Sequence, residues 1–258
     1  MASSNSLTPD ELTFYQDQGY LILPGRFRAD VERLREEAAG LLARTELISK
    51  DNMRCRWLPH HLTGESLFEC YDPITDISPL LLKYSRDPRL VEPLRSIYGC
   101  DPCLRHDQLI YKPPGCGGYS LHQDFMGWPG YPTTFLTAII ALDVIDTENG
   151  CIQVYPGIHK QGYLSPIDEE YHEVPKEKLV GIEPVELKLN PGDVAMFGCF
   201  TPHASGFNRS ADRWRRQLFF CYNAETDGGD ARDAHYRFYN DWKLKKYVAY
   251  GKTNAYFA

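Results

Sequence analysis

A histidine and an aspartate two residues apart, His122 and Asp124, stand in the run YSLHQDFMGW, which otherwise consists mostly of apolar and aromatic residues. Residues two apart in a β-strand point to the same face, so an imidazole and a carboxylate would project side by side into one space. The pair therefore predicts two of the three protein ligands of a metal site.

The best candidate for a third ligand is His203, in the run FTPHASGFNRS. It follows a predicted turn, NPGD, and an apolar strand, and the small residues after it leave room beside the imidazole. We expect it to face the other two ligands across a barrel. The remaining histidines have no such setting: His60, His61, His106, His159, His172 and His235.

Two histidines and one carboxylate on one face leave half of the positions of an octahedral metal open, which is typical of non-heme Fe(II) oxygenases. In the enzymes that use 2-oxoglutarate, the keto acid end of this cosubstrate binds iron, O2 takes the last position, and the far carboxylate needs a fixed cation. Arginine suits that task because its planar guanidinium grips a carboxylate with two parallel hydrogen bonds. Three arginines stand at the start of the last predicted strand: Arg213, Arg215 and Arg216.

Two other functions fit parts of this pattern. A zinc hydrolase or lyase would use the same three ligands with a bound water as the nucleophile, but it leaves the arginine cluster unexplained. A non-catalytic barrel that binds metal or senses a ligand is the other alternative. Production of succinate from 2-oxoglutarate would separate the three hypotheses.

The elements that position these residues begin with helices. Thr8, Pro9 and Glu11 form a helix N-terminal signature, with a hydroxyl cap, proline at the first helical position and glutamate at the third. The signature predicts a helix to about Gln18, ended by Gly19, and the following YLIL predicts a short strand. Apolar residues at helical spacing predict two more helices, over residues 29–47 and 87–98.

Beyond residue 103 the pattern changes to short β-like runs separated by glycine, proline and asparagine. Such runs predict a mainly β fold with flanking helices, a double-stranded β-helix (jelly roll, cupin-like) with an N-terminal helical layer. No linker or repeat is visible, so we expect one domain over residues 1–258, with helices at about 8–100, the β-helix at about 104–223 and a C-terminal extension at 224–258. The expected strands are residues 104–111, 121–125, 135–142, 151–155, 185–189, 193–197, 204–207 and 216–222.

Composition limits the class of partner. The chain of 258 residues has a formal net charge of −7 at pH 7 and lacks the concentrated basic patch that nucleic-acid binding requires. No stretch approaches the roughly 20 apolar residues that cross a bilayer. The eight cysteines are expected to be reduced, because the polar N-terminus lacks a secretion signal. We therefore expect a cytoplasmic protein that binds a small molecule and neither nucleic acid nor membrane; the sequence does not indicate its oligomeric state.

In their order along the chain the motifs resemble a known family. HQD is followed by DTENGCIQVYPGIHK, NPGDVAMF, PHASGFNRS and WRRQLFF, and this series is similar to that of the phytanoyl-CoA dioxygenase (PhyH) family of Fe(II)- and 2-oxoglutarate-dependent oxygenases. The similarity runs from about Thr8 to Tyr222. It implies a dioxygenase that uses Fe(II), 2-oxoglutarate and O2, and that usually hydroxylates a C–H bond with formation of succinate and CO2.

The resemblance also implies roles for individual residues. His122, Asp124 and His203 match the iron ligands, and the carboxylate argues against the related halogenases, in which a small residue replaces it. Ser205 and Arg215 match positions that bind the far carboxylate of 2-oxoglutarate.

Two weaker matches and one ambiguity remain within the resemblance. Gln108 and Thr137 match pocket contacts in the family. The turn SADRW, between the distal histidine and the arginines, carries one residue more than is usual. Neighbours in a strand face opposite ways, so only one of Arg215 and Arg216 can serve as the anchor, and alignment of DRWRRQL favours Arg215.

Two segments could contact the substrate. Phe125, Met126 and Trp128 directly follow the metal motif and either line the site or belong to the core. The segment Asn52–Leu62 lies before the barrel, where the family often covers the barrel mouth, and is otherwise a solvated loop. Its candidates for an anionic or polar substrate are Arg54, Arg56, His60 and His61.

Overall fold

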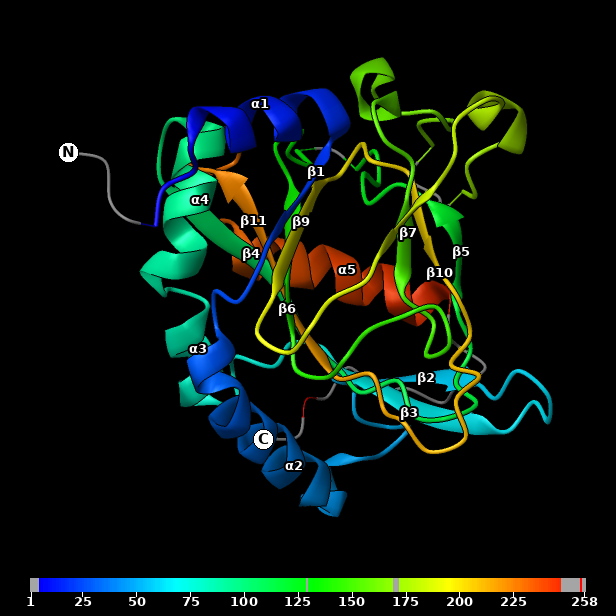
Figure 1. The fold of residues 1–258 in the computed structure, drawn as a ribbon. Helices are drawn as coiled ribbons and strands as arrows, with labels where there is room; N and C mark the ends of the chain where they lie inside the picture. Colours follow the sequence, from blue (N-terminus) through cyan, green and yellow to red (C-terminus); the bar gives the residue numbers. More distant parts are fainter. Residues whose placement is uncertain (1–4, 129, 169–171, 247–255, 257–258) are drawn as a thin grey trace.

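The computed structural model describes residues 5–128, 130–168, 172–246 and 256. Its centre is a pair of sheets that face each other, and each strand pairs with its neighbours in antiparallel orientation (Figure 1). The larger sheet has the order β1-β9-β6-β11-β4-β3-β2, with β1 (Tyr20–Leu23), β2 (Cys55–Pro59), β3 (Ser66–Tyr71), β4 (Pro102–Ile110), β6 (Leu136–Ala141), β9 (Val194–Gly198) and β11 (Gln217–Ala224). The smaller has the order β5-β10-β7-β8, with β5 (Tyr119–His122), β7 (Ile152–Val154), β8 (Val185–Leu187) and β10 (His203–Ser205).

The first helix, α1 (Pro9–Gln18), forms as its N-terminal signature predicts. The Thr8 hydroxyl accepts a hydrogen bond from the Glu11 N–H at 3.2 Å, and the Glu11 carboxylate accepts one from the Thr8 N–H at 2.8 Å. Gly19 ends the helix at φ 79°, a left-handed conformation that glycine adopts without strain. The helix therefore begins at the predicted cap and ends at Gly19, directly before β1, as predicted.

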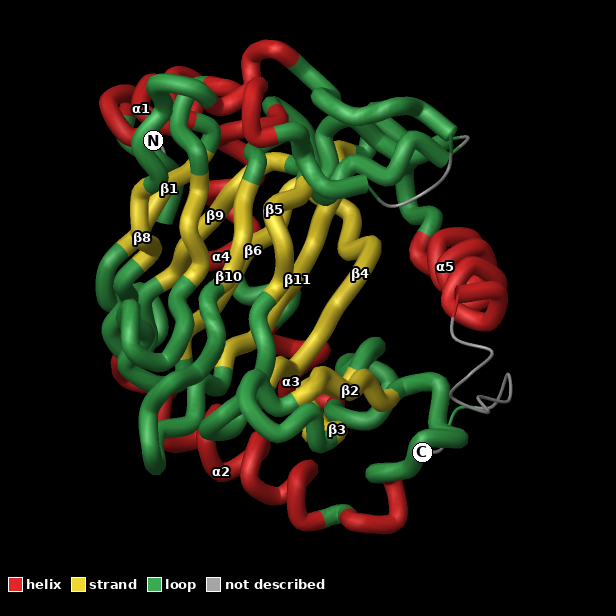
Figure 2. Tube along the Cα trace, turned by 90° about the vertical axis from the view of Figure 1, so that its right-hand side faces the viewer, coloured by secondary structure: helices red, strands yellow, loops and turns green. Residues whose placement is uncertain are grey.

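Three further helices cover the outer face of the larger sheet (Figures 1 and 2). The predicted second helix is shorter than expected, because short 3₁₀ turns flank it on both sides. Buried side chains of these helices form one core with residues of β6, β9 and β11. The three helices are α2 (Val31–Ala43), α3 (Pro79–Tyr84) and α4 (Pro88–Tyr98).

Strand β6 shows how one strand serves two cores. Ala138 and Ile140 belong to the core under the helices, whereas Ile139 and Ala141 belong to the core between the two sheets. Because successive side chains in a strand alternate between faces, a strand buried on both sides becomes almost continuously apolar, as LTAIIA is apart from Thr137. This strand therefore packs against the helices on one face and against the second sheet on the other.

Two larger differences from the sequence-based expectation lie in the stretch before β4 and in the C-terminal extension. A hairpin of β2 and β3 lies within the stretch that we expected to be helical, and it extends the larger sheet beyond β4. The C-terminal extension contains a helix, α5 (Arg232–Lys246), which lies beside β4 and apart from the other helices (Figure 2). Among the helices of the described residues, none has both the length and the apolar character that crossing a bilayer requires.

An ion pair fixes α5 to the barrel. Arg232 donates to the fully buried Asp107 at 2.8 and 3.0 Å, and Asp107 also accepts backbone N–H bonds from Ile74 and Thr75 at 2.7 and 2.8 Å. Asp107 therefore links β4, the segment after β3 and α5.

Replacing Arg232 with methionine is expected to lower the free energy of unfolding by roughly 3 kcal/mol, because it leaves a buried carboxylate without its cation. The denaturant midpoint should fall accordingly. Arg95→Met, which removes an exposed ion pair with Glu92 and Asp101, should change stability little. Equal midpoints for the two variants would show that α5 does not depend on this contact.

Candidate metal centre and cosubstrate pocket

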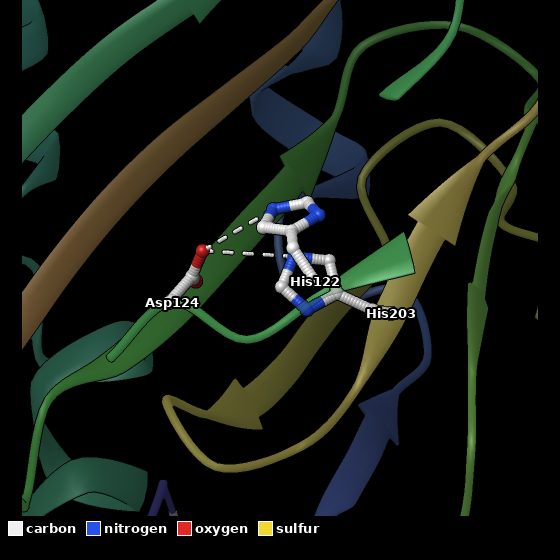
Figure 3. Close-up of side chains that lie close together, drawn as sticks. All are labelled: His122, Asp124 and His203. Carbon is white, nitrogen blue, oxygen red and sulfur yellow. Dashed lines mark ion pairs between the residues drawn. The ribbon is translucent and has the colours of Figure 1, made fainter. Parts of the chain in front are cut away.

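The structure brings together His122, Asp124 and His203, whose candidate ligand atoms all lie within 4.8 Å of one another. Asp124 Oδ1 is 3.7 Å from Nε2 of His122 and 3.6 Å from Nε2 of His203 (Figure 3). The two histidines are direct partners in the pairing of β5 with β10. His203 therefore lies beside His122 in the same sheet, not across the barrel as we expected, and sheet pairing sets the separation of the two imidazoles.

Backbone carbonyls orient both imidazoles. Nδ1 of His122 is 2.7 Å from the Ser120 carbonyl oxygen, and Nδ1 of His203 is 3.0 Å from that of Thr201. A carbonyl only accepts, so Nδ1 carries the proton and Nε2 presents its lone pair, which is the second-shell arrangement of metal-binding histidines. Burial and the neighbouring His203 lower the pKa of His122 to about 4, so this imidazole is neutral at pH 7.

Asp124 lies just beyond the end of β5, so the strand alternation that suggested a shared face does not itself aim this carboxylate. A residue on β6 orients the carboxylate instead. The Thr137 hydroxyl on β6 donates to Asp124 Oδ2 at 2.9 Å, whereas Oδ1 faces both histidines. Thr137 therefore holds one carboxylate oxygen and leaves the other for a metal.

Thr137→Val keeps the shape of this side chain and removes the hydrogen bond to Asp124. Iron affinity is expected to fall by about tenfold, the usual order of a lost second-shell contact, and competition with a chelator would measure it. Thr137→Ser should restore most of the affinity. Thr133→Val, which removes a hydroxyl bonded to Asp227 at 3.1 Å, is the matched control, and an equal loss in both variants would refute this role.

The three candidate arginines have different surroundings. Arg213 pairs with Asp146 at 2.8 Å, and Arg216 pairs with Asp143 at 2.8 Å. Arg215 is 1% exposed, has no carboxylate within ion-pair distance among the described residues, and keeps a buried Nε without a hydrogen-bond partner. Burial lowers the pKa of Arg215 to about 10, so the guanidinium stays charged at pH 7 and lacks a counter-ion.

Ser205 and Lys112 lie at the same end of the site as Arg215. The Ser205 hydroxyl accepts hydrogen bonds from Lys112 Nζ and the Tyr119 N–H, both at 3.2 Å, which leaves its own proton for a bound acceptor. Burial and then the charge of Arg215 lower the pKa of Lys112 well below its usual value. Unpaired donors around a buried cation form a cradle that fits the far carboxylate of 2-oxoglutarate.

Lys112 was not among the residues singled out in the sequence. It is fully buried, and its φ of 37° makes it the one non-glycine residue with a positive φ in the described part of the chain. Such strain at a non-glycine residue is often found at functional sites. The sequence offers only a lysine after an apolar strand, in LIYKPP, which an exposed strand end would equally explain.

The site contains a cavity of about 480 Å³. The candidate residues that line it are His122, Asp124, His203, Arg215, Ser205, Gln108 and Thr137. Of the residues after the metal motif, Met126 and Trp128 line the cavity, whereas Phe125 packs against Phe200 and Tyr131 in the adjoining core.

The segment Asn52–Leu62 is partly strand β2 rather than a loop, and only some of its candidates reach the cavity. Arg56 lines it. Arg54 is buried elsewhere and donates to the Pro73 carbonyl. His60 and His61 stack on each other outside the cavity, and His61 stacks on Phe207.

Helix α5 supplies cavity residues that the sequence analysis missed. His235, Tyr239 and Trp242 recur at helical spacing, and this stripe in HYRFYNDWK is the signal that could have revealed them. His106 on β4 also lines the cavity, with Nδ1 3.1 Å from His235 Nε2. Burial lowers the pKa of both histidines, so they form a neutral pair beside the site.

Comparison with known proteins identifies the family of this chain. The family model described as phytanoyl-CoA dioxygenase (PhyH) matches residues 15–217. The chain belongs to the phytanoyl-CoA dioxygenase family. The family and the enzyme class predicted from the sequence, a dioxygenase, are therefore confirmed. The matched range holds every candidate residue of the metal cluster and of the anchor, and it ends before α5.

Several known proteins are similar to this chain over half of its length or more. The chain is 28% identical over 244 residues to the dioxygenase lolE1 of Epichloe uncinata, covering 89% of this chain and 88% of that protein. It is 34% identical over 146 residues to a methylphosphonate hydroxylase of Gimesia maris, covering 55% and 52%. A solved structure of EctD from S. alaskensis with 2-oxoglutarate and 5-hydroxyectoine has a TM-score of 0.70 at 23% identity, covering 88% and 82%. This likeness confirms the jelly-roll fold.

Proposed function

We propose that the protein is an Fe(II)- and 2-oxoglutarate-dependent dioxygenase that hydroxylates a C–H bond of a small-molecule metabolite. One observation carries the proposal: a buried arginine without a counter-ion, Arg215, shares a cavity with a cluster of two histidines and one carboxylate. A zinc hydrolase would need the cluster but not the arginine.

His122, Asp124 and His203 would hold Fe(II) through two Nε2 atoms and one carboxylate oxygen. This donor set suits iron and leaves the remaining coordination positions for cosubstrate and O2. The bond from Thr137 to Asp124 Oδ2 favours ligation through Oδ1 alone. A carboxylate that binds through a single oxygen leaves more room at the metal.

Arg215 and Ser205 would bind the far carboxylate of 2-oxoglutarate, with Lys112 behind them. When bound, Fe(II), O2 and 2-oxoglutarate supply the oxidising chemistry, in which the cosubstrate becomes succinate and CO2 while one oxygen atom enters the substrate. The residues of the chain position the reactants and exclude water. The neighbouring aromatic residues Trp128 and Tyr131 contribute to that exclusion, since both are buried.

We further propose that residues 1–258 act as one catalytic domain, because α5 near the end of the chain lines the same cavity as β2 and β5. The cytoplasm remains the proposed location. None of the eight cysteines forms a disulfide, as is usual in a reducing compartment.

Incubation with Fe(II), 2-oxoglutarate, O2 and a mixture of metabolites tests the function. Succinate is expected to form, with a mass increase of one oxygen atom in one metabolite, and replacement of Fe(II) by Zn(II) should abolish both signals. Metabolite turnover with Zn(II) and without consumption of 2-oxoglutarate would instead support the hydrolase.

A further inference from the structure

Arg56 on β2 faces the same cavity as the metal cluster. Within the described residues its guanidinium donates one hydrogen bond, to Gln108 Oε1 at 3.1 Å, and its buried Nε has no partner. A guanidinium has five N–H donors. Most of the hydrogen-bonding capacity of this cation is therefore unused inside a cavity.

The counter-ions of Arg56 lie behind it. The carboxylates of Glu69 and Asp72 are 3.6 and 3.8 Å from its nitrogens, both are fully buried, and neither lines the cavity. These separations exceed hydrogen-bond distance. The carboxylates keep the guanidinium charged and oriented while its other face remains directed into the cavity.

Lys243 on α5 adds a second cation to the same wall. Its ammonium lies 4.4 Å from the centre of the Tyr239 ring, and its side chain lines the cavity. Burial would raise the pKa of Asp72, but the nearby cations Lys243 and Arg56 lower it to about 2. Both cations therefore line the same part of the cavity, near Asp72.

Aromatic residues line the path from this end to the metal cluster. Tyr119 lies between the two: its ring centre is 5.8 Å from the Arg56 guanidinium and 6.4 Å from the His122 ring. On the other side Trp128 packs against Tyr131 and Trp242. A ligand that reaches from Arg56 to the metal therefore spans about one aromatic ring and meets mainly carbon on the way.

The charges at the metal end of the cavity balance without a contribution from the substrate. In the proposed loaded site, Asp124 and the two carboxylates of 2-oxoglutarate offset Fe(II) and Arg215. Apart from Asp124, no aspartate or glutamate of the described residues lines the cavity. A positively charged substrate would meet Arg56 and Lys243 first, whereas an acid group would find the unused N–H donors of Arg56 beside a second cation.

We infer that the substrate is a small organic oxyanion, a carboxylate or a phosphonate, whose acid group binds Arg56 and Lys243 and whose carbon body lies against the aromatic wall. This inference rests on the proposed function, because it names the substrate class of that site. Carboxylate and phosphonate share the acceptor geometry that a guanidinium recognises.

Calorimetric titration of the metal-free protein in the presence of EDTA tests the acid subsite without requiring turnover. The probes are phenylacetate, benzylphosphonate, the neutral phenylacetamide and the cationic benzylamine. Both acids are expected to bind at least about tenfold more tightly than the amide and the amine, as a charge-assisted contact provides. The tighter acid identifies the natural group. Equal affinities for amide and acids would overturn the inference.

Substitutions test which residues bind the acid probes. Arg56→Met and Lys243→Met should each weaken acid binding about tenfold or more, whereas Arg44→Met, which removes an exposed pair with Glu46, should not. Should Arg56→Met fail to fold, the double variant Arg56→Met, Glu69→Gln removes cation and counter-ion together.

Arg215→Lys separates the two anion sites. If it weakens probe binding and Arg56→Met does not, the probes occupy the cosubstrate anchor, and the inference fails. The two conclusions can fail separately. If the protein forms succinate but Arg56→Met binds the acids as tightly as the wild type, the inference is wrong and the proposed function stands.

Discussion

The His203→Ala variant is expected to lose its iron and its turnover together. His203 is one of two imidazoles that sheet pairing places opposite each other, with ring centres 4.2 Å apart and planes tilted by 50°, so its removal leaves an incomplete set of ligands. Loss of a residue that only orients a metal ligand typically costs 10- to 100-fold in metal affinity. We therefore expect a loss above about 100-fold for a residue that would bind the metal itself, measured as bound iron after desalting and as succinate formed.

His172→Ala is the matched control, because His172 also pairs with a carboxylate, Asp168, at 2.7 Å but lies outside the cavity. It should retain both iron and turnover. Since His203 is buried, the thermal midpoint of both variants must be compared with that of the wild type. A folded His203→Ala protein with full iron content and full consumption of 2-oxoglutarate would show that the ligand assignment is wrong.

Arg215→Ala is expected to raise KM for 2-oxoglutarate steeply while iron affinity changes little. Removal of one partner of a buried charge pair costs roughly 3 kcal/mol or more, and this corresponds to a factor of about 100 or more. Arg215→Lys should show an intermediate effect, because lysine keeps the charge but loses the two-pronged geometry. Succinate formation at varied 2-oxoglutarate concentration measures KM for each variant.

Arg216→Ala is the control for the anchor, since Arg216 donates to Asp143 on the outer side of the barrel at 2.8 and 2.9 Å. Its effect on KM should be small. The reverse ranking of the two alanine variants would transfer the anchor to Arg216. Small effects from both would undermine the use of 2-oxoglutarate.

Much of the helical layer and most strands could be predicted because their signals are local. The cap formed by Thr8 and Glu11 is contained within four residues, and the buried run of β6 is readable from its apolar side chains alone. The hairpin of β2 and β3 was not predicted because it joins the sheet by pairing with β4 residues about forty positions further along the chain. A pairing at such a separation leaves little trace in either segment.

Some residues of the candidate site could likewise be predicted from the sequence, and others could not. His122, Asp124 and His203 could be proposed from residue types, spacing and the order of motifs. Thr137 was expected as a pocket contact, but its bond to Asp124 depends on how β6 lies beside the end of β5. Lys112 and the aromatic stripe of α5 carry no recognisable motif. Only the tertiary contacts connect them with the site: Lys112 donates to Ser205, and the stripe lines the cavity.

The sequence by itself determined the enzyme family, the mainly β fold and the identity of the candidate metal ligands, because motif order and the alternation of apolar residues are properties of the chain. Only the tertiary structure decided that Arg215 faces inward while Arg216 pairs outside, and that Arg56 and Lys243, 187 positions apart in the numbering, share one wall. The physical reason is that a charge acquires its role from its burial and its neighbours. Both depend on the packing of distant segments, which local sequence does not encode.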